Sequence, residues 1–138
     1  MAFPCWDEPA LKSTFDISIK HFSNYTALSN MPVKAIYFDF VEEKVWTIFQ
    51  TTPTMSTYLV CFTVSNFVNI TKPGTNLTIW SRKSVVESMT LGLEIISRAL
   101  PVLEEYTDVK YELPKIDIIA IPNYIHGAME NWGLIVFR

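Results

Sequence analysis

The feature that most constrains the fold of this chain is a change in the spacing of its apolar residues near residue 84. Before that point, apolar and β-branched residues form short, partly alternating runs at 14–20, 44–50, 56–67 and 77–82. After it, apolar residues recur every three or four positions. A period of two is typical of half-buried strands, and a period near 3.6 of a helix with one buried face. The sequence predicts an α+β fold, mostly β, in which antiparallel strands with one covered face precede a helix.

Turn-forming residues divide the first part of the chain. Pro32 and Pro53 separate the runs, and the clearest turn is TKPGTN at 71–76. We expect a domain boundary just after this turn. The strand expected at 77–82 would then lead into a different kind of structure.

The helix is expected to start beside Ser84 and Glu87, which have the S-x-x-E spacing of a capping box. The apolar stripe that follows consists of Val85, Met89, Leu93, Ile96, Leu100 and Leu103. Its periodicity favours a core-facing surface over a cofactor site. Pro101 removes one backbone hydrogen bond, so it should kink the helix or end its regular part.

Two further strands, at 115–122 and 133–138, enclose a loop with the sequence NYIHGAMEN. Within it, the small residues Gly127 and Ala128 would let main-chain groups approach a ligand closely. The Glu130 carboxylate suits an ammonium group, to which it offers charge-assisted hydrogen bonds. The competing interpretation is a surface turn whose glutamate is solvated or pairs with a lysine, and composition alone favours it.

Charge and hydropathy exclude some classes of partner. Eleven basic and fourteen acidic residues give a net charge of −3 with no basic run, which argues against nucleic-acid binding. The longest apolar runs fall well short of the roughly 20 residues that cross a bilayer, so we expect neither a membrane span nor a signal peptide in this chain. The 49% hydrophobic fraction suggests that some apolar surface meets further chain.

The cysteines and the sequons bear on the cellular compartment. Cys5 and Cys61 permit one disulfide, although two buried free thiols are the simpler interpretation. N-x-S/T sequons begin at Asn24, Asn69 and Asn76. Three in under 60 residues favour a glycosylated protein of the secretory pathway over chance.

The pentapeptide Gly127-Ala128-Met129-Glu130-Asn131 resembles the GAMEN signature of the M1 family of zinc aminopeptidases, which are gluzincins related to aminopeptidase N. FPCWDEP (3–9) and TTPTMSTYLVCFTVSNF (51–67) resemble other family segments, and the order and spacing agree over essentially the whole chain. The resemblance, closest to the metazoan ectoenzyme branch, implies that residues 1–78 end a saddle-like β-domain. Residues 79–138 would begin a thermolysin-like catalytic domain and stop just after the signature.

The resemblance also implies roles for the loop residues. Glu130 would bind the α-ammonium group of a peptide and so determine where the peptide is cut. The backbone of Gly127 and Ala128 would pair with the first peptide unit, while Met129 and Asn131 shape the loop. The implied partners are peptides with a free N-terminus, and the implied location is the outer face of the plasma membrane or the extracellular space.

Zinc in this family is held by H-E-x-x-H and a more distant glutamate. The chain contains only His21 and His126, far apart in sequence, so we expect no zinc ligand and no catalytic residue within it. We expect a segment of a zinc aminopeptidase that is inactive alone. The alternative is a non-catalytic, glycosylated module that binds peptides or proteins, and the oligomeric state stays open.

Overall fold

The computed structural model describes residues 3–138, which form two compact units. The first unit contains the chain up to Ser65 together with Glu130–Leu134. The second contains Asn66–Met129 and Ile135–Arg138. Strands contain more residues than helices in the described chain as a whole, and its α-helical part is a single segment, which confirms an α+β fold that is mostly β.

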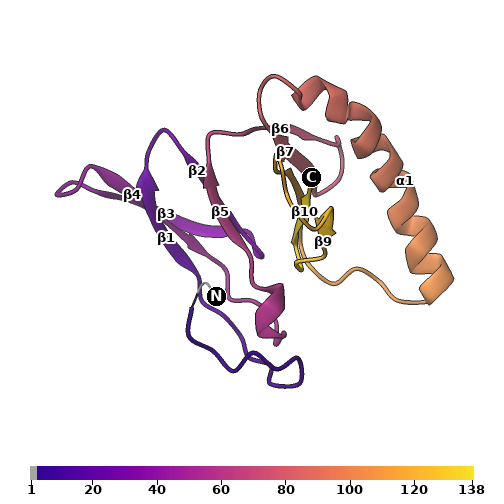
Figure 1. The fold of residues 1–138 in the computed structure, drawn as a ribbon, viewed down its shortest axis with the longest axis horizontal. Helices are drawn as coiled ribbons and strands as arrows, with labels where there is room; N and C mark the ends of the chain where they lie inside the picture. Colours follow the sequence, from indigo (N-terminus) through magenta and orange to yellow (C-terminus); the bar gives the residue numbers. More distant parts are fainter. Residues whose placement is uncertain (1–2) are drawn as a thin grey trace. The chain divides into compact units, whose positions relative to one another are not determined.

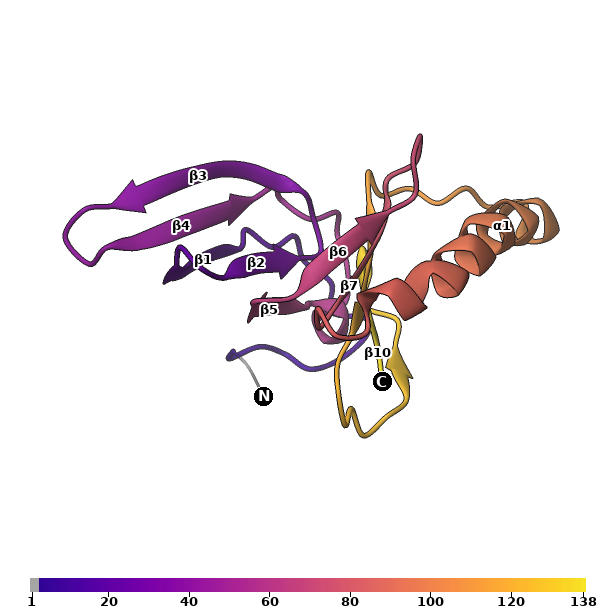
Figure 2. The same cartoon turned by 90° about the horizontal axis from the view of Figure 1, so that it is seen from above.

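The first unit contains two antiparallel sheets. The larger has the order β1-β4-β3, where β1 is Ser18–Phe22, β4 is Lys44–Phe49 and β3 is Val33–Asp39. The smaller pairs β2 (Thr26–Ser29) with β5 (Phe62–Ser65). Figure 2 shows β3 and β4 as the two arms of one long hairpin. Buried Thr47 and Phe49 alternate with more exposed residues along β4, which confirms a sheet with one covered face.

The strands expected at 44–50, 77–82, 115–122 and 133–138 are all present. The strand expected at 14–20 is only partly correct, because β1 starts at Ser18. The prediction of one long strand at 56–67 is wrong, since Thr57–Leu59 forms a 3₁₀-helix, η1, and only β5 is extended there. The N–H groups of Leu59 and Val60 donate to the carbonyls of Ser56 and Thr57 at 3.2 Å, so they cannot also pair with a neighbouring strand.

The second unit is built on a sheet with the order β6-β7-β8-β10-β9. Its strands are β6 (Val68–Thr71), β7 (Leu77–Ser81), β8 (Ile116–Ala120), β10 (Leu134–Phe137) and β9 (Ala128–Met129). The hairpin between β6 and β7 confirms the turn at 71–76, in which Gly74 has the positive φ (76°) that favours glycine. β7 and β8 are parallel, so a crossover must connect them, and a helix supplies it.

That helix, α1, spans Thr90–Thr107 and lies along one side of the sheet in Figure 1. Leu93 joins the buried core of Leu77, Ile79, Ile116 and Ile118, and three further stripe residues pack against it: Met89, Ile96 and Leu100. This confirms the helix and most of its apolar stripe. Leu103 is 56% exposed, so the core ends about one turn earlier than expected.

The predicted capping box is wrong. A short 3₁₀-helix, η2 (Val86–Met89), precedes α1, and Met89 occupies the N-cap position without a side-chain cap bond. The backbone turns before the helix at Ser84, because the N–H of Val85 donates to the carbonyl of Arg82 at 3.0 Å, and Val85, not Ser84, precedes the first residue of η2.

Pro101 does not end the helix. α1 continues six residues past it and is drawn as one unbroken coil in Figure 1. Packing of Leu93, Ile96 and Leu100 on the sheet anchors the preceding two turns, which compensates for the single hydrogen bond that proline cannot donate. The helix ends where Asp108 adopts a left-handed conformation (φ 54°).

The carboxamide of Asn30 joins three segments of the first unit. Asn30 is fully buried (0% exposed), and its Nδ2 donates to the carbonyls of Leu59 (2.8 Å) and Trp132 (2.7 Å). Its Oδ1 accepts from the N–H of Cys61 at 2.9 Å. One side chain therefore bonds main-chain groups at the end of η1, just before β5 and in the segment Glu130–Leu134.

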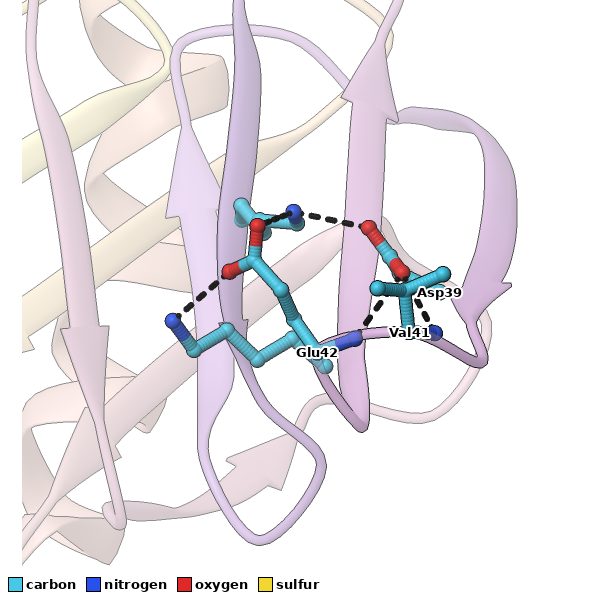
Figure 3. A network of polar contacts seen from close by, with 5 residues as sticks. Asp39, Val41 and Glu42 are labelled. Atoms are coloured by element: carbon cyan, nitrogen blue, oxygen red, sulfur yellow. Dashed lines mark hydrogen bonds and ion pairs between the residues drawn. The ribbon is translucent and has the colours of Figure 1, made fainter.

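A charge network closes the tip of the β3–β4 hairpin and is drawn in Figure 3. Lys20 Nζ lies 2.7 Å from Asp39 and 2.6 Å from Glu42, and Lys44 Nζ lies 3.0 Å from Glu42. Asp39 also accepts from the N–H groups of Val41 and Glu42, which holds the turn. The hydrogen bond to Asp39, followed by that to Glu42, raises the pKa of Lys20. Lys20 in turn lowers the pKa of both carboxyl groups.

Replacing Asn30 with alanine should destabilise the first unit strongly. The change removes three hydrogen bonds to partly buried main-chain groups, and about 1 kcal/mol for each bond suggests a loss of roughly 3 kcal/mol. Urea denaturation measures the loss, and hydrogen exchange should quicken at the N–H of Leu134. Asn66→Ala, at an exposed position, is the control and should stay within about 0.5 kcal/mol of the parent. An equally small effect for Asn30→Ala would contradict the role assigned to the carboxamide.

The charge network should stabilise the chain only in a defined pH window. The depressed pKa values of Asp39 and Glu42 stabilise the fold above the ordinary carboxyl range, and this contribution disappears as pH falls through the lower folded values. The raised pKa of Lys20 stabilises the fold below the ordinary lysine range, and its contribution disappears as pH rises through the higher folded value. Lys20→Gln should therefore flatten the fall in melting temperature between about pH 5 and 2.

The matched control for this prediction is Lys83→Gln, because Lys83 is exposed and makes no ion pair within residues 3–138. It should leave the acid limb of the melting curve unchanged. If both variants give the same pH profile as the parent chain, the network contributes nothing measurable to stability.

Candidate functional site

The signature loop begins with a tight turn centred on Gly127. The N–H of Ala128 donates to the carbonyl of His126 at 2.8 Å, and Gly127 has φ 72°. This bond between residues two apart, with a positive central φ, defines a γ-turn that only glycine adopts readily. No atom lies within 4 Å of where a Cβ would stand, so the backbone conformation, not crowding, requires glycine here.

β9 follows this turn and forms one outer edge of the five-stranded sheet. Ala128 lies opposite Phe137 and Met129 opposite Val136, while the carbonyl of Gly127 accepts from the N–H of Arg138 at 2.8 Å. Hydrogen-bonding groups alternate in direction along an antiparallel strand. Since Gly127 faces β10, the carbonyl of Ala128 points to the open edge of the sheet.

Glu130 comes directly after this edge strand, and its side chain is exposed. Within residues 3–138 its carboxylate makes no hydrogen bond and no ion pair. The lysine partner considered from the sequence is therefore not found in the described chain. The carboxylate is solvated, with its full acceptor capacity available to a ligand.

Asn131 differs from Glu130 in its environment, because it is 6% exposed. Its Nδ2 lies 3.4 Å from the carbonyls of both Tyr58 and Leu59, and its own carbonyl accepts from the N–H of Leu134 at 3.1 Å. Together with the bond from Asn30 to Trp132, these contacts anchor Glu130–Leu134 to η1. Asn131 is a buried positioning residue of the loop.

Asn30 is the residue supporting this loop that sequence reasoning missed. It lies about 100 positions from the loop that it supports, and it belongs to no pattern of spacing that would mark it. The only local signal is a polar residue just before Met31 and Pro32, which predicts a turn and nothing about a distant partner.

The two histidines have separate local partners. His21 is buried, with Nδ1 2.9 Å from the carbonyl of Phe22 and Nε2 2.8 Å from Thr47 Oγ1. His126 is exposed, and its ring makes an edge contact with Tyr124 at 5.9 Å between centroids. Across residues 3–138, no three His, Cys, Asp or Glu side chains are grouped so that they could hold a metal ion. The described residues therefore do not fit a zinc centre.

The sequon asparagines are all exposed. Asn24 lies between β1 and β2, Asn69 lies within β6, and Asn76 directly precedes β7. Cys5 and Cys61 are not joined in a disulfide, and both are partly buried. The described chain has no helix that combines the length and the apolarity needed to cross a membrane.

Known proteins match the chain along nearly its whole length. A model of the peptidase M1 N-terminal domain matches residues 1–59, and a model of the peptidase family M1 domain matches residues 91–138. The expected boundary near residue 78 falls between these matches and stays a prediction. Human aminopeptidase Q is 44% identical over 98% of the chain, and rat thyrotropin-releasing hormone-degrading ectoenzyme is 43% identical over 99%.

Dog aminopeptidase N is 42% identical over 99% of the chain. The chain spans 13–15% of the length of these three relatives. The two domain models occur in the order expected from the M1 resemblance, and the second includes the whole loop described above. The chain belongs to the peptidase M1 family of aminopeptidases.

Proposed function

We propose that Gly127–Asn131 binds the free N-terminus of a peptide and supplies substrate recognition to a zinc aminopeptidase that removes N-terminal residues. The observation that carries this proposal is an unpaired, exposed carboxylate directly after the open edge of a sheet. An extended peptide can add to such an edge through main-chain hydrogen bonds. The carboxylate then meets the charge that distinguishes a free N-terminus from an internal peptide bond.

Each loop residue has a distinct part in this proposal. The outward carbonyl of Ala128 accepts a hydrogen bond from the substrate, while that of Gly127 already accepts from Arg138 and keeps β9 in register. Glu130 is the counter-charge for the α-ammonium group. Met129 and the buried Asn131 fix the backbone conformation on either side of Glu130.

The strength of the ammonium contact depends on how much water surrounds it. An exposed ion pair contributes about 0–1 kcal/mol, whereas a desolvated, hydrogen-bonded pair contributes about 2–5 kcal/mol. Glu130 is exposed in this chain, so binding by these residues alone should discriminate only about fivefold. In a longer protein, further residues that exclude water from the ion pair would raise the preference for a free N-terminus toward a hundredfold.

Hydrolysis requires groups that the described residues lack. The family resemblance implies a zinc ion held by an H-E-x-x-H helix, and bound zinc would supply the activated water for peptide cleavage. In this proposal those ligands lie outside the 138 residues. The residues present here bind and orient the peptide, and they take part in no proton transfer.

The proposed location is the cell surface or the extracellular space. Three exposed sequons support passage through the secretory pathway. The relative that degrades thyrotropin-releasing hormone is named as an ectoenzyme, which agrees with this location.

Glu130→Gln should weaken binding of a peptide with a free N-terminus about fivefold and leave binding of the N-acetylated peptide unchanged, because only the ammonium group needs the charge. Fluorescence anisotropy with a peptide labelled at its C-terminus measures both affinities. Glu105→Gln, another exposed glutamate without an ion pair in the described chain, is the matched control. Equal affinity of the parent chain for free and acetylated peptides would refute the proposed role.

Glu130→Gln should have a larger effect on a longer M1 protein that includes this chain, lowering kcat/KM for an aminoacyl anilide about a hundredfold. Peptide binding that needs Glu130 but is accompanied by no turnover would instead identify the non-catalytic binding module.

The preference for a free N-terminus should also depend on the ionisation of the peptide. An α-amino group has a pKa of about 8, so the charged form that Glu130 binds disappears as pH rises from about 7 to 9. Affinity for the free peptide should fall across that interval to the value for the acetylated one. Glu130→Gln should show no such slope, and a slope that persists in this variant would assign the effect to another group.

A further inference from the structure

The hairpin of β6 and β7 carries two of the three sequons, Asn69-Ile-Thr71 and Asn76-Leu-Thr78. We propose that the first sugar of an N-glycan on Asn69 packs against the indole ring of Trp80. This surface of the sheet would then bind a sugar that is attached to the same chain. The inference rests on modification of the sequon. It is independent of the proposed peptide-binding role.

The strand register brings the two residues together. Asn69 lies directly opposite Trp80 in the antiparallel pair of β6 and β7. Side chains of directly opposed residues project from the same face with Cβ atoms about 4.5–5.5 Å apart. Asn69 is exposed and Trp80 is partly exposed, so a sugar linked to the asparagine can reach the ring.

The opposite face of the hairpin is the one covered by helix α1. Ile70 and Ile79, the next pair in the register, belong to the apolar cluster around Leu93. Side chains alternate between the faces of a strand, so Asn69 and Trp80 project away from α1. The helix therefore does not compete with a sugar for the indole.

Trp80 is held as a rigid platform. Its Nε1 donates to Asp117 Oδ1 at 3.0 Å, and Asp117 is buried and lies 2.7 Å from Lys115 Nζ. Fixing the ring before the sugar binds reduces the side-chain entropy that packing would otherwise cost. Weak C–H contacts from a sugar ring to the aromatic face then add to the burial of the indole.

Polar groups form the next pair on the same face of the hairpin, two register positions from Asn69 and Trp80. Thr71 and Thr78 lie opposite each other, and their hydroxyl oxygens are 3.1 Å apart. These hydroxyls can bond an N-acetyl group or a sugar hydroxyl beside the ring. An apolar ring bordered by hydroxyl groups suits N-acetylglucosamine, the sugar attached directly to asparagine.

Asn76 provides an internal comparison. It stands just before β7 and outside the paired residues of the hairpin, so it has no aromatic residue opposite it in the register. A glycan on Asn76 shares the hairpin and the sequon type with one on Asn69 but not the platform. Only the glycan on Asn69 should depend on Trp80.

The test is a double-mutant cycle on the 138-residue chain secreted from a eukaryotic host, with glycans trimmed to a single N-acetylglucosamine. Mass spectrometry reports occupancy of Asn69, and thermal unfolding reports stability. Asn69→Gln should lower the melting temperature by about 3 °C in the parent and by less than about 1 °C in the presence of Trp80→Leu. Asn76→Gln should give the same shift in both backgrounds.

A second measurement avoids changing Trp80, in case the leucine variant fails to fold. The acetyl and ring protons of the sugar on Asn69 should be shifted upfield in NMR spectra by the indole, while those on Asn76 should resemble a free glycopeptide. An unoccupied Asn69, equal melting shifts in both backgrounds, or unshifted sugar protons on Asn69 would each overturn the proposal.

Discussion

The path of the segment Glu130–Leu134 depends on the hydrogen bonds of one buried carboxamide, that of Asn30. Asn30 makes three hydrogen bonds to partly buried main-chain groups of Leu59, Cys61 and Trp132. At about 1 kcal/mol for each bond, the amide favours one path for the backbone. That path includes the 3₁₀ turn at Thr57–Leu59, whose carbonyls Asn131 contacts. Asn131 directly follows the exposed Glu130, so these contacts also fix one end of that residue's backbone.

In the proposed site, the residues that position the loop are different from the residue that would meet the ligand. The groups that position it, Asn30 and Asn131, are buried and bonded to main chain, whereas Glu130 is exposed and has no partner in the described chain. Positioning groups thus keep their geometry without a ligand, and the charged group keeps its hydration until one arrives. The short strand β9, at an open sheet edge, adds a main-chain carbonyl that needs no particular side chain.

Sequence reasoning succeeded where the residues of a short stretch determine the structure of that same stretch. The strand β4, the stripe of α1 and the turn at Gly74 were predicted from aromatic and β-branched residues, from apolar periodicity and from turn-forming residues in the same short stretch. It failed where a local 3₁₀ turn replaced the expected hydrogen bonds, and where the partner lies far away in the sequence. The strand expected across Thr57–Leu59 lost its hydrogen bonds to a local turn, and the cap expected at Ser84 was displaced by η2. Glu130 was found through a motif, while Asn30, with no motif, was not.

The first unit is discontinuous in sequence, because Glu130–Leu134 completes a body otherwise made of the chain up to Ser65. On a ribosome, Asn30 can bond the N–H of Cys61 long before Trp132 exists. At about 5–20 residues per second, the 71 residues between positions 61 and 132 take roughly 4–14 s to make. During that interval one donor of the amide must bond water or a chaperone. The order of synthesis therefore makes Glu130–Leu134 the last segment of the first unit to be placed, and a chain interrupted before Trp132 would lack the final hydrogen bond of Asn30.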